Sequence, residues 1–305
     1  MMRTLTMTAL LVLAAVQPGV AQKTARTFPS PEAAGAALVA AFEQNDDPAL
    51  RDVLGPGSDD ITQQGSDPLV AASRKDLAAA GKRKLTVDRS TPDRVVLDFG
   101  DDAWPSPVPL VEKAGVWYFD VAAGREEVLA RTIGRNELRA IGICEDYIDA
   151  QAAYASQDRD GDDVRQYAQR LLSTPGKQDG LYWDDPTGDD PSPLDVALGD
   201  LANPTPGQPY GGYSWRILTG QGPKAAGGAY SYIINGNMIA GFALVGTPTE
   251  YRKTGVMTFL VSNNGIVYEK DLGPQSVETA KAMTVFDPDD TWTKVTSAEE
   301  SEAQR

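Results

Sequence analysis

The chain has 305 residues, a formal net charge of −15 at pH 7 and a sequence pI of about 4.5. This acidic character excludes nucleic acids and anionic membranes as partners, because binding to either requires a cationic patch. The sequence contains no His, which excludes Ser-His-Asp and Cys-His catalytic arrangements and His-containing zinc sites. A catalytic function would therefore depend on carboxylates, Tyr, Lys, Ser or Thr.

Residues 1–21 predict a secretory signal peptide. Arg3 supplies a positive charge, residues 5–16 are apolar, and small residues precede the expected cleavage after Ala21. The apolar run is shorter than the roughly 20 residues that cross a bilayer, and an uncleaved anchor is the alternative interpretation. We expect the mature chain to be secreted or periplasmic, with no part inserted in a membrane.

Residues 22–123 predict an α+β domain in which helices precede an antiparallel sheet. Ser30 is a predicted N-cap, because Pro31 follows it at the first helical position. Two more helices are expected, near residues 45–54 and 69–80. Runs rich in β-branched and aromatic residues predict strands at residues 85–88, 94–99, 108–113 and 116–121, with Ala114-Gly115 as the turn between the last two. This element order resembles that of nuclear transport factor 2-like (NTF2-like) domains.

Residues 124–295 predict a second α+β domain, whose first element is a long helix. The helix is expected to begin near Arg125, to break or kink near Gly134 and to carry a wide apolar face that packs against a sheet. The positions of this face are Leu138, Ile141, Cys144 and Ile148, widened by Ile143, Tyr147 and Tyr154. Cys144 is the only Cys, so it forms no internal disulfide, and its place on this face indicates a small buried hydrophobic residue.

An acidic loop follows this helix and is the one motif that indicates a specific chemistry. Its carboxylates occupy alternate positions, and a Gly lies between two of them. Calcium takes about six to eight oxygen ligands, and Asp at alternate positions of a tight loop supplies three of them. The predicted metal ligands are Asp158, Asp160, Asp162 and the backbone carbonyl of Val164. Calcium is thus the one cofactor that the sequence suggests.

The loop departs from an EF-hand at two positions. Asp163 takes the place of the turn-forming Gly, and Gln169 takes the place of the bidentate Glu. Acids at residues 184–185 or 189–190 are expected to complete the coordination. The alternative interpretation needs no ion: the acids cap the positive end of a predicted helix at residues 164–172.

The rest of the chain predicts an antiparallel sheet after a connector rich in Asp, Pro and Gly. Asn263-Asn264-Gly265 predicts a hairpin turn, and residues 296–305 predict a disordered tail. The predicted strands are residues 213–219, 230–235, 241–245, 256–261 and 266–270. A candidate exposed binding patch, with packing inside the sheet as the alternative, consists of Tyr210, Tyr213, Trp215, Tyr230 and Tyr232.

Five long runs, at residues 124–141, 149–162, 167–183, 212–230 and 250–274, resemble domain-of-unknown-function family 2950. The resemblance implies an exported bacterial protein and transfers no catalytic residue. The second half is also similar to the globular domains of type IV pilins and type II secretion pseudopilins, in which a long helix packs across a small antiparallel sheet and some loops hold calcium. The chain lacks a prepilin cleavage site and a very hydrophobic N-terminal helix, so this similarity implies the fold and not filament formation.

These patterns favour a non-enzymatic exported protein with a binding or assembly role at the cell envelope. Its expected partner is an envelope protein or a small ligand. The alternative function is a carboxylate-dependent, glycosidase-like hydrolase acting on an extracytoplasmic substrate, which requires two carboxyl groups about 5 to 9.5 Å apart. No catalytic residue is predicted, because no spacing selects a pair among the 43 Asp and Glu residues.

Overall fold

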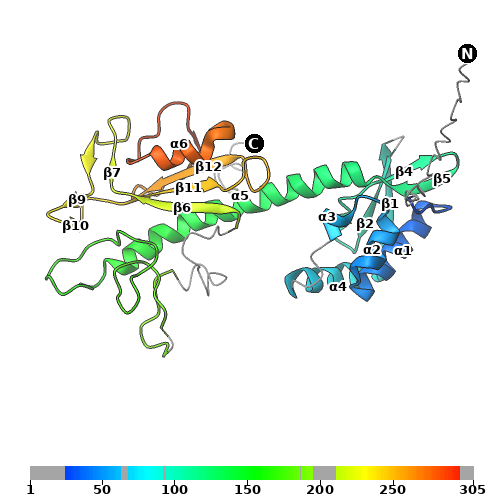
Figure 1. Cartoon of the computed structure of the whole chain (residues 1–305), viewed down its shortest axis with the longest axis horizontal. Coiled ribbons are helices and arrows are strands. Elements are labelled where there is room, and N and C mark those ends of the chain that lie inside the picture. The colour runs from blue at the N-terminus through cyan, green and yellow to red at the C-terminus, as the bar shows by residue number, and fades with distance from the viewer. Residues whose placement is uncertain (1–24, 63–67, 92–93, 186, 195–210, 296–305) are drawn as a thin grey trace, which may run out of the picture. The chain divides into compact units, whose positions relative to one another are not determined.

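The computed structural model describes residues 25–62, 68–91, 94–185, 187–194 and 211–295. Helices and antiparallel sheets occur together, which confirms the α+β class (Figure 1). The chain forms two compact units, Met1–Val128 and Leu129–Arg305, and each unit has a hydrophobic core of its own. The predicted signal peptide at residues 1–21 and the predicted tail at residues 296–305 lie outside the described residues.

Helices open the first unit, and two of them begin at side-chain caps. Ser30 Oγ accepts the backbone N–H of Ala33 at 3.2 Å, which confirms the predicted N-cap. Asp46 Oδ2 accepts the N–H of Ala49 at 3.3 Å in the same way. The helices are α1 (Pro31–Gln44), α2 (Asp47–Leu54), α3 (Asp59–Thr62) and α4 (Pro68–Arg83).

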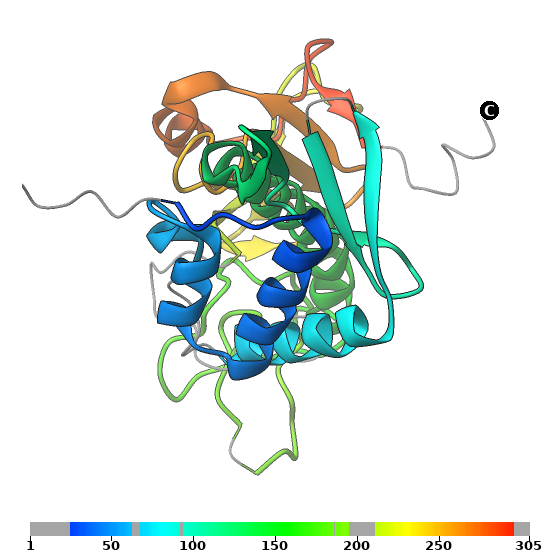
Figure 2. The same cartoon turned by 90° about the vertical axis from the view of Figure 1, so that its right-hand side faces the viewer.

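An antiparallel sheet follows in the order β1-β2-β4-β5, with β3 paired to β2. Ala114 and Gly115 have φ angles of 53° and 79°, so they form the predicted hairpin turn. Figure 2 shows the helices of this unit, in blue and cyan, on one side of its strands. The strands are β1 (Leu85–Thr91), β2 (Arg94–Phe99), β3 (Trp104–Pro105), β4 (Leu110–Lys113) and β5 (Val116–Phe119).

Helix α5 (Val121–Tyr154) spans 34 residues and continues through Gly134, so the helix does not break there. A Gly inside a helix costs only about 1 kcal/mol relative to Ala, and good helix formers on both sides offset that cost. Among the described helices, none has an apolar stretch long enough to cross a membrane.

The buried face of α5 differs from the predicted one near its middle. Leu138 is 72 % exposed, whereas Cys144 and Tyr147 are buried. A helix turns by about 100° per residue, so Tyr147 lies on the side opposite Leu138, and packing the Tyr147 ring on the sheet leaves Leu138 outside. Burial raises the pKa of the Cys144 thiol, which stays protonated, as expected of a buried hydrophobic residue. The buried residues are Ala140, Ile143, Cys144, Tyr147, Ala150 and Tyr154.

The second unit is built on a sheet in the order β14-β13-β12-β11-β6, in which all neighbours are antiparallel. Helix α5 covers one face of this sheet and α6 covers the other (Figure 1). The Tyr147 hydroxyl of α5 donates to the Ala243 carbonyl at 3.3 Å, and Arg216 of β6 donates to the Ala280 carbonyl of α6. The strands of the sheet are β6 (Tyr213–Leu218), β11 (Ala243–Pro248), β12 (Met257–Ser262), β13 (Tyr268–Asp271) and β14 (Thr293–Lys294).

Short elements complete the second unit. The single strand predicted at residues 230–235 is divided in two, because β8 pairs with β7 whereas β9 pairs with β10. Helix α6 and the turn of 3₁₀ helix before it are not predicted from the sequence. These elements are β7 (Gly220–Gln221), β8 (Tyr230–Ser231), β9 (Ile233–Ile234), β10 (Asn237–Met238), η1 (Gly273–Gln275) and α6 (Ser276–Ala282).

Residues 164–172 form an irregular segment without a helix, so the helix predicted there is wrong. Gln151, which is fully buried on α5, accepts the N–H of Ala168 at 2.8 Å and donates to its carbonyl at 2.9 Å. The N–H of Tyr167 donates to the Met238 carbonyl at 2.8 Å. A buried backbone group left unpaired costs about 1–3 kcal/mol, so these tertiary hydrogen bonds outweigh the local helix preference.

Replacing Gln151 with Met is expected to destabilise the fold by about 2–5 kcal/mol, because two buried backbone groups of Ala168 lose their partner. Urea denaturation of the chain from Gln22 onward measures the free energy of unfolding. Gln157→Met is the matched control, since Gln157 is exposed just after α5, and it should change stability by less than about 0.5 kcal/mol. Equal effects of the two substitutions would show that the Gln151 contacts do not hold this segment.

Candidate functional site

The acidic loop brings three carboxylates together just beyond the end of α5. Oxygen atoms of Asp158, Asp160 and Asp162 lie within 4.8 Å of one another, and all three residues are exposed. Such separations allow one hard cation to contact all three. The crowding has an electrostatic consequence, because partial loss of hydration and the charge of Asp162 raise the pKa of Asp160.

Backbone hydrogen bonds close this loop. Asp158 accepts the N–H groups of Gly161 and Asp163, each at 2.9 Å, and these bonds lower the pKa of its carboxyl group. Gly161 and Asp163 have positive φ angles of 75° and 64°, which turn the chain around the Asp158 carboxylate. The loop's own backbone therefore supplies the geometry that gathers the carboxylates.

Side chains on both sides of the loop reach the other two carboxylates. Gln166 donates to Asp160 at 2.8 Å, and Asn237 donates to Asp162 at 2.7 Å. The N–H of Val164 donates to Asp162 at 2.8 Å, so the backbone of Val164 adjoins the cluster through its N–H group. Side-chain amides carry an oxygen as well as a donor, so Gln166 and Asn237 can turn an oxygen toward a cation.

The acids at residues 184–185 and 189–190 do not join this cluster. Among the described residues, the group that can hold a metal consists of Asp158, Asp160 and Asp162. Asp185 instead accepts the N–H of Asp190 at 2.7 Å, and this bond closes a separate loop. The expected completion of the coordination by these acids is therefore not found in the described part of the chain.

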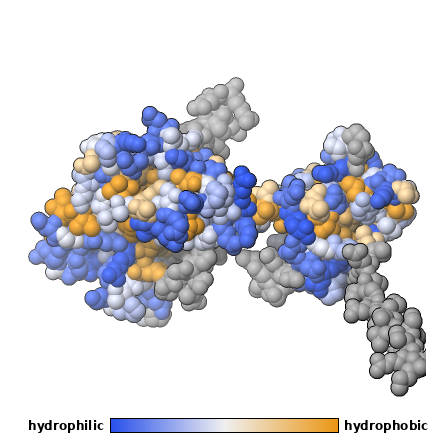
Figure 3. Space-filling view, turned by 45° about the horizontal axis from the view of Figure 1, so that its top comes forward, coloured by the Kyte–Doolittle hydropathy of each residue, from blue (hydrophilic) through white to orange (hydrophobic). Residues whose placement is uncertain are grey.

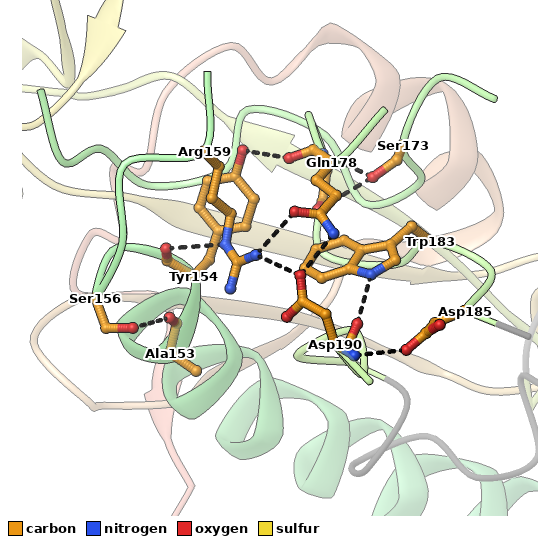
Figure 4. A network of polar contacts seen from close by, with 10 residues as sticks. Ala153, Tyr154, Ser156, Arg159, Ser173, Gln178, Trp183, Asp185 and Asp190 are labelled. Carbon is orange, nitrogen blue, oxygen red and sulfur yellow. Dashed lines mark hydrogen bonds and ion pairs between the residues drawn. The ribbon is translucent and has the colours of Figure 1, made fainter. Parts of the chain in front are cut away.

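Arg159 links the acidic loop to the segment that follows (Figure 4). Its side chain is only 7 % exposed. The guanidinium lies 4.7 Å from the ring centre of Trp183 and 5.3 Å from that of Tyr154. Nη1 donates to Gln178 Oε1 at 3.2 Å and lies 3.7 Å from Asp190 Oδ2. Sequence reasoning misses this residue. The signal that marks it is a lone Arg among alternating acids, which is typical of a local ion pair.

A hollow of about 630 Å³ lies beside this contact. Its wall is a tight turn, in which the N–H of Lys177 donates to the Thr174 carbonyl at 2.9 Å. The Thr174 hydroxyl donates to Asp179 at 2.8 Å, which holds the turn closed. Its lining includes the side chains of Lys177, Gln178, Tyr182, Trp183 and Asp184. No sequence pattern indicates this hollow, because its walls are irregular loop.

The predicted aromatic patch is not one exposed surface. Tyr213 and Tyr232 are buried, and their hydroxyl groups hydrogen bond to groups inside the unit. Trp215 is half-buried, and Tyr230 is exposed. Tyr210 lies outside the described residues. Packing inside the unit is therefore the better interpretation of Tyr213 and Tyr232.

Two glutamates that are far apart in the sequence interact between α5 and the sheet. Glu137 of α5 accepts the N–H groups of Val256 and Met257 at 2.7 and 3.0 Å, which ties the helix to the start of β12. Burial and the charge of Glu137 raise the pKa of Glu269 in β13. No local pattern connects these positions, so sequence reasoning misses the pair.

The loop, Arg159 and the hollow all lie within residues 25–295, which match the family model described as "Protein of unknown function (DUF2950)". The chain belongs to the DUF2950 family. Neither the curated proteins nor the solved structures provide a match, so the pilin-like and NTF2-like similarities are not confirmed. The function of this DUF2950 protein has to be inferred from the geometry of its own residues.

Glu137→Ala and Glu269→Gln are expected to change stability in opposite directions at pH 7. Glu137→Ala removes a charged acceptor of two N–H groups and should cost about 2 kcal/mol. Glu269→Gln removes a carboxylate whose ionisation the fold disfavours. Its stabilising effect should be less than about 1 kcal/mol, because solvent screens a half-exposed group. The midpoint of thermal unfolding measures both effects.

Measuring the stabilising effect of Glu269→Gln at several pH values tests whether removal of the carboxylate charge causes it. The pKa of Glu269 in the folded chain lies above its ordinary value of 4.5. The folded state therefore binds this proton more tightly than the unfolded state, and it loses stability as the pH rises through the raised pKa. The gain from Glu269→Gln should be present at pH 7 and vanish near pH 4. A gain that persists at pH 4 would contradict the electrostatic explanation.

Proposed function

We propose that this DUF2950 protein is an exported, non-enzymatic binding protein of the cell envelope, whose second unit binds a cationic segment of an envelope protein in the hollow beside Arg159. The observation that carries the proposal is the lining of the hollow, where Tyr182 and Trp183 lie next to the exposed Asp184. Aromatic rings and a carboxylate together recognise a Lys or Arg side chain, through cation–π attraction and an ion pair.

The charge around the hollow supports a cationic partner. Residues 155–190 contain nine Asp against four Lys and Arg, and much of the second unit's surface is hydrophilic in Figure 3. A negative patch raises the local concentration of cations and speeds their association. Arg159 shows the same kind of recognition within the chain, since its guanidinium packs on the Trp183 ring and lies beside the Asp190 carboxylate.

Calcium has a structural role in this proposal. A bound ion would offset the repulsion among the loop carboxylates and stiffen the loop that carries Arg159. Because Arg159 contacts Trp183 and Gln178, which line the hollow, an ordered loop supports an ordered hollow. The proposed ligands are Asp158, Asp160, Asp162 and the backbone carbonyl of Val164.

Export and the finer fold similarities belong to the same proposal. The predicted signal peptide at residues 1–21 supports a secreted or periplasmic location. The order of helices before an antiparallel sheet supports an NTF2-like first unit. A long helix packed against an antiparallel sheet supports a pilin-like second unit.

Thermal unfolding in calcium and in chelator tests the ion. Calcium at about a hundred times its dissociation constant is expected to stabilise the fold by about 2.7 kcal/mol, and magnesium should not match this shift. Asp160→Asn should abolish the shift. In chelator the same substitution should leave stability unchanged or higher, because it removes a carboxylate whose pKa is raised.

Asp102→Asn is the matched control for the calcium experiment, since Asp102 is an exposed carboxylate of the first unit. It should keep the full calcium shift. If the Asp160→Asn variant keeps the calcium-dependent shift in thermal unfolding, the ion binds elsewhere in the chain. A wild-type chain with no shift would remove calcium from the proposal and leave the loop as a backbone-capped turn.

Fluorescence anisotropy of a labelled hexalysine peptide tests the binding function. The chain from Gln22 onward is expected to bind the peptide, and Tyr182→Ala and Asp184→Asn should each weaken binding about tenfold, or about 1.4 kcal/mol. Tyr230→Ala and Asp102→Asn remove the same groups at exposed positions elsewhere and should leave the affinity within about twofold. If the control variants weaken binding equally, general charge attraction explains the binding. If the wild-type chain binds neither hexalysine nor hexaarginine, the proposal of a cationic ligand is refuted.

A carboxylate-dependent hydrolase is the alternative function, and one observation favours it. Burial and the charge of Glu137 raise the pKa of Glu269, and a carboxyl group with a raised pKa near a second carboxyl group suits acid–base hydrolysis. The two backbone N–H groups bound to Glu137 favour a structural role instead. Release of reducing sugars from cell-wall polysaccharide by the wild-type chain, lost in Glu269→Gln, would favour the hydrolase over the binding protein.

A further inference from the structure

A second surface lies on helix α5, and it is independent of the proposed binding function. Leu138 is 72 % exposed, the largest value among the described large hydrophobic residues. The opposite side of the helix packs on the sheet through Tyr147, so the Leu138 side chain projects away from the core of its unit.

The residues one turn before and one turn after Leu138 are Gly134 and Gly142. A Cβ atom added at either glycine would meet nothing within 4 Å, so both positions leave open space beside Leu138. Residues spaced by four form the ridge that interdigitates in the commonest class of helix packing. This face therefore presents one projecting side chain between two recesses.

Charges of opposite sign flank Leu138 on the same face. Arg131 and Arg135 precede it and Glu145 follows it, whereas Glu127 and Asp149 lie farther out, one toward each end of the helix. Arg131 and Glu145 are equally far from Leu138 along the helix, and steps of three and four residues keep them on its side. A second helix that runs antiparallel, with the two Leu138 side chains adjacent, would place each Arg131 near Glu145 of the other copy.

We propose that α5 is a docking surface for a second copy of this chain, with the two helices antiparallel and crossing at Leu138. The surface is self-complementary, as a two-fold symmetric interface requires, because each Leu138 can enter a recess at Gly134 or Gly142 of the other copy. A parallel arrangement would place Arg131 near Arg131 and Glu145 near Glu145, and like charges disfavour it.

Sedimentation velocity of the chain from Gln22 onward, over a range of concentrations, tests the dimer. The wild-type chain is expected to show a concentration-dependent monomer–dimer equilibrium, which Leu138→Asp should weaken at least tenfold. Ile234→Asp is the matched control at another exposed apolar residue and should leave the equilibrium unchanged. Circular dichroism checks that both variants are folded. A wild-type chain that stays monomeric throughout, or a dimer that Leu138→Asp leaves intact, would overturn the proposal.

Charge reversal tests the antiparallel orientation. Arg131→Glu and Glu145→Arg should each weaken dimerisation about tenfold, because each creates two like-charge contacts. The double variant, Arg131→Glu with Glu145→Arg, should recover wild-type dimerisation, since the ion pairs form again with their charges exchanged. A double variant as weak as the single ones would refute the antiparallel arrangement.

Discussion

The side chain of Gln151 hydrogen bonds to both the N–H and the carbonyl of Ala168, as the backbone of a neighbouring strand would. This contact fixes the path of residues 164–172. A side-chain amide offers the same donor and acceptor as a peptide group. Because Gln151 and Ala168 are both buried, a path that moved Ala168 away would leave the Gln151 amide unpaired. The segment at residues 164–172 connects the acidic loop to the loops that line the hollow, so Gln151 fixes the chain between the two candidate sites while belonging to neither.

Charges near these sites are stabilised in two different ways. The acids of the loop stay in water, where backbone N–H groups compensate Asp158. Arg159 is withdrawn from water and is compensated by the rings of Tyr154 and Trp183 and by Gln178. A guanidinium suits such a place, because it is weakly hydrated and stacks on aromatic faces. One side chain thus connects the proposed ion site to the proposed ligand site.

Helix α5 has a different role on each of its sides. Tyr147 and Gln151 face the interior and bond to the sheet and the segment at Ala168. Glu137 ties the helix to β12, and Leu138 projects outward. Neighbouring residues can therefore differ completely in environment, because each step along the helix changes direction by about 100°. The proposed dimer uses the side of α5 opposite Tyr147, so it leaves the core contacts of the second unit undisturbed.

Features whose cause lies within a few residues follow from the sequence alone. The Ser30 cap, the Ala114-Gly115 turn and the alternating acids after α5 are of this kind, because backbone preferences and short spacings act locally. Features that need a distant partner arise only in the folded chain. They are the irregular segment at Ala168, the exposure of the Leu138 side chain, the contacts that surround the Arg159 guanidinium and the hollow beside them. Local preferences differ by about 1 kcal/mol per residue or less, whereas a buried group that loses its partner costs about 1–3 kcal/mol. Tertiary packing therefore prevails wherever the two disagree.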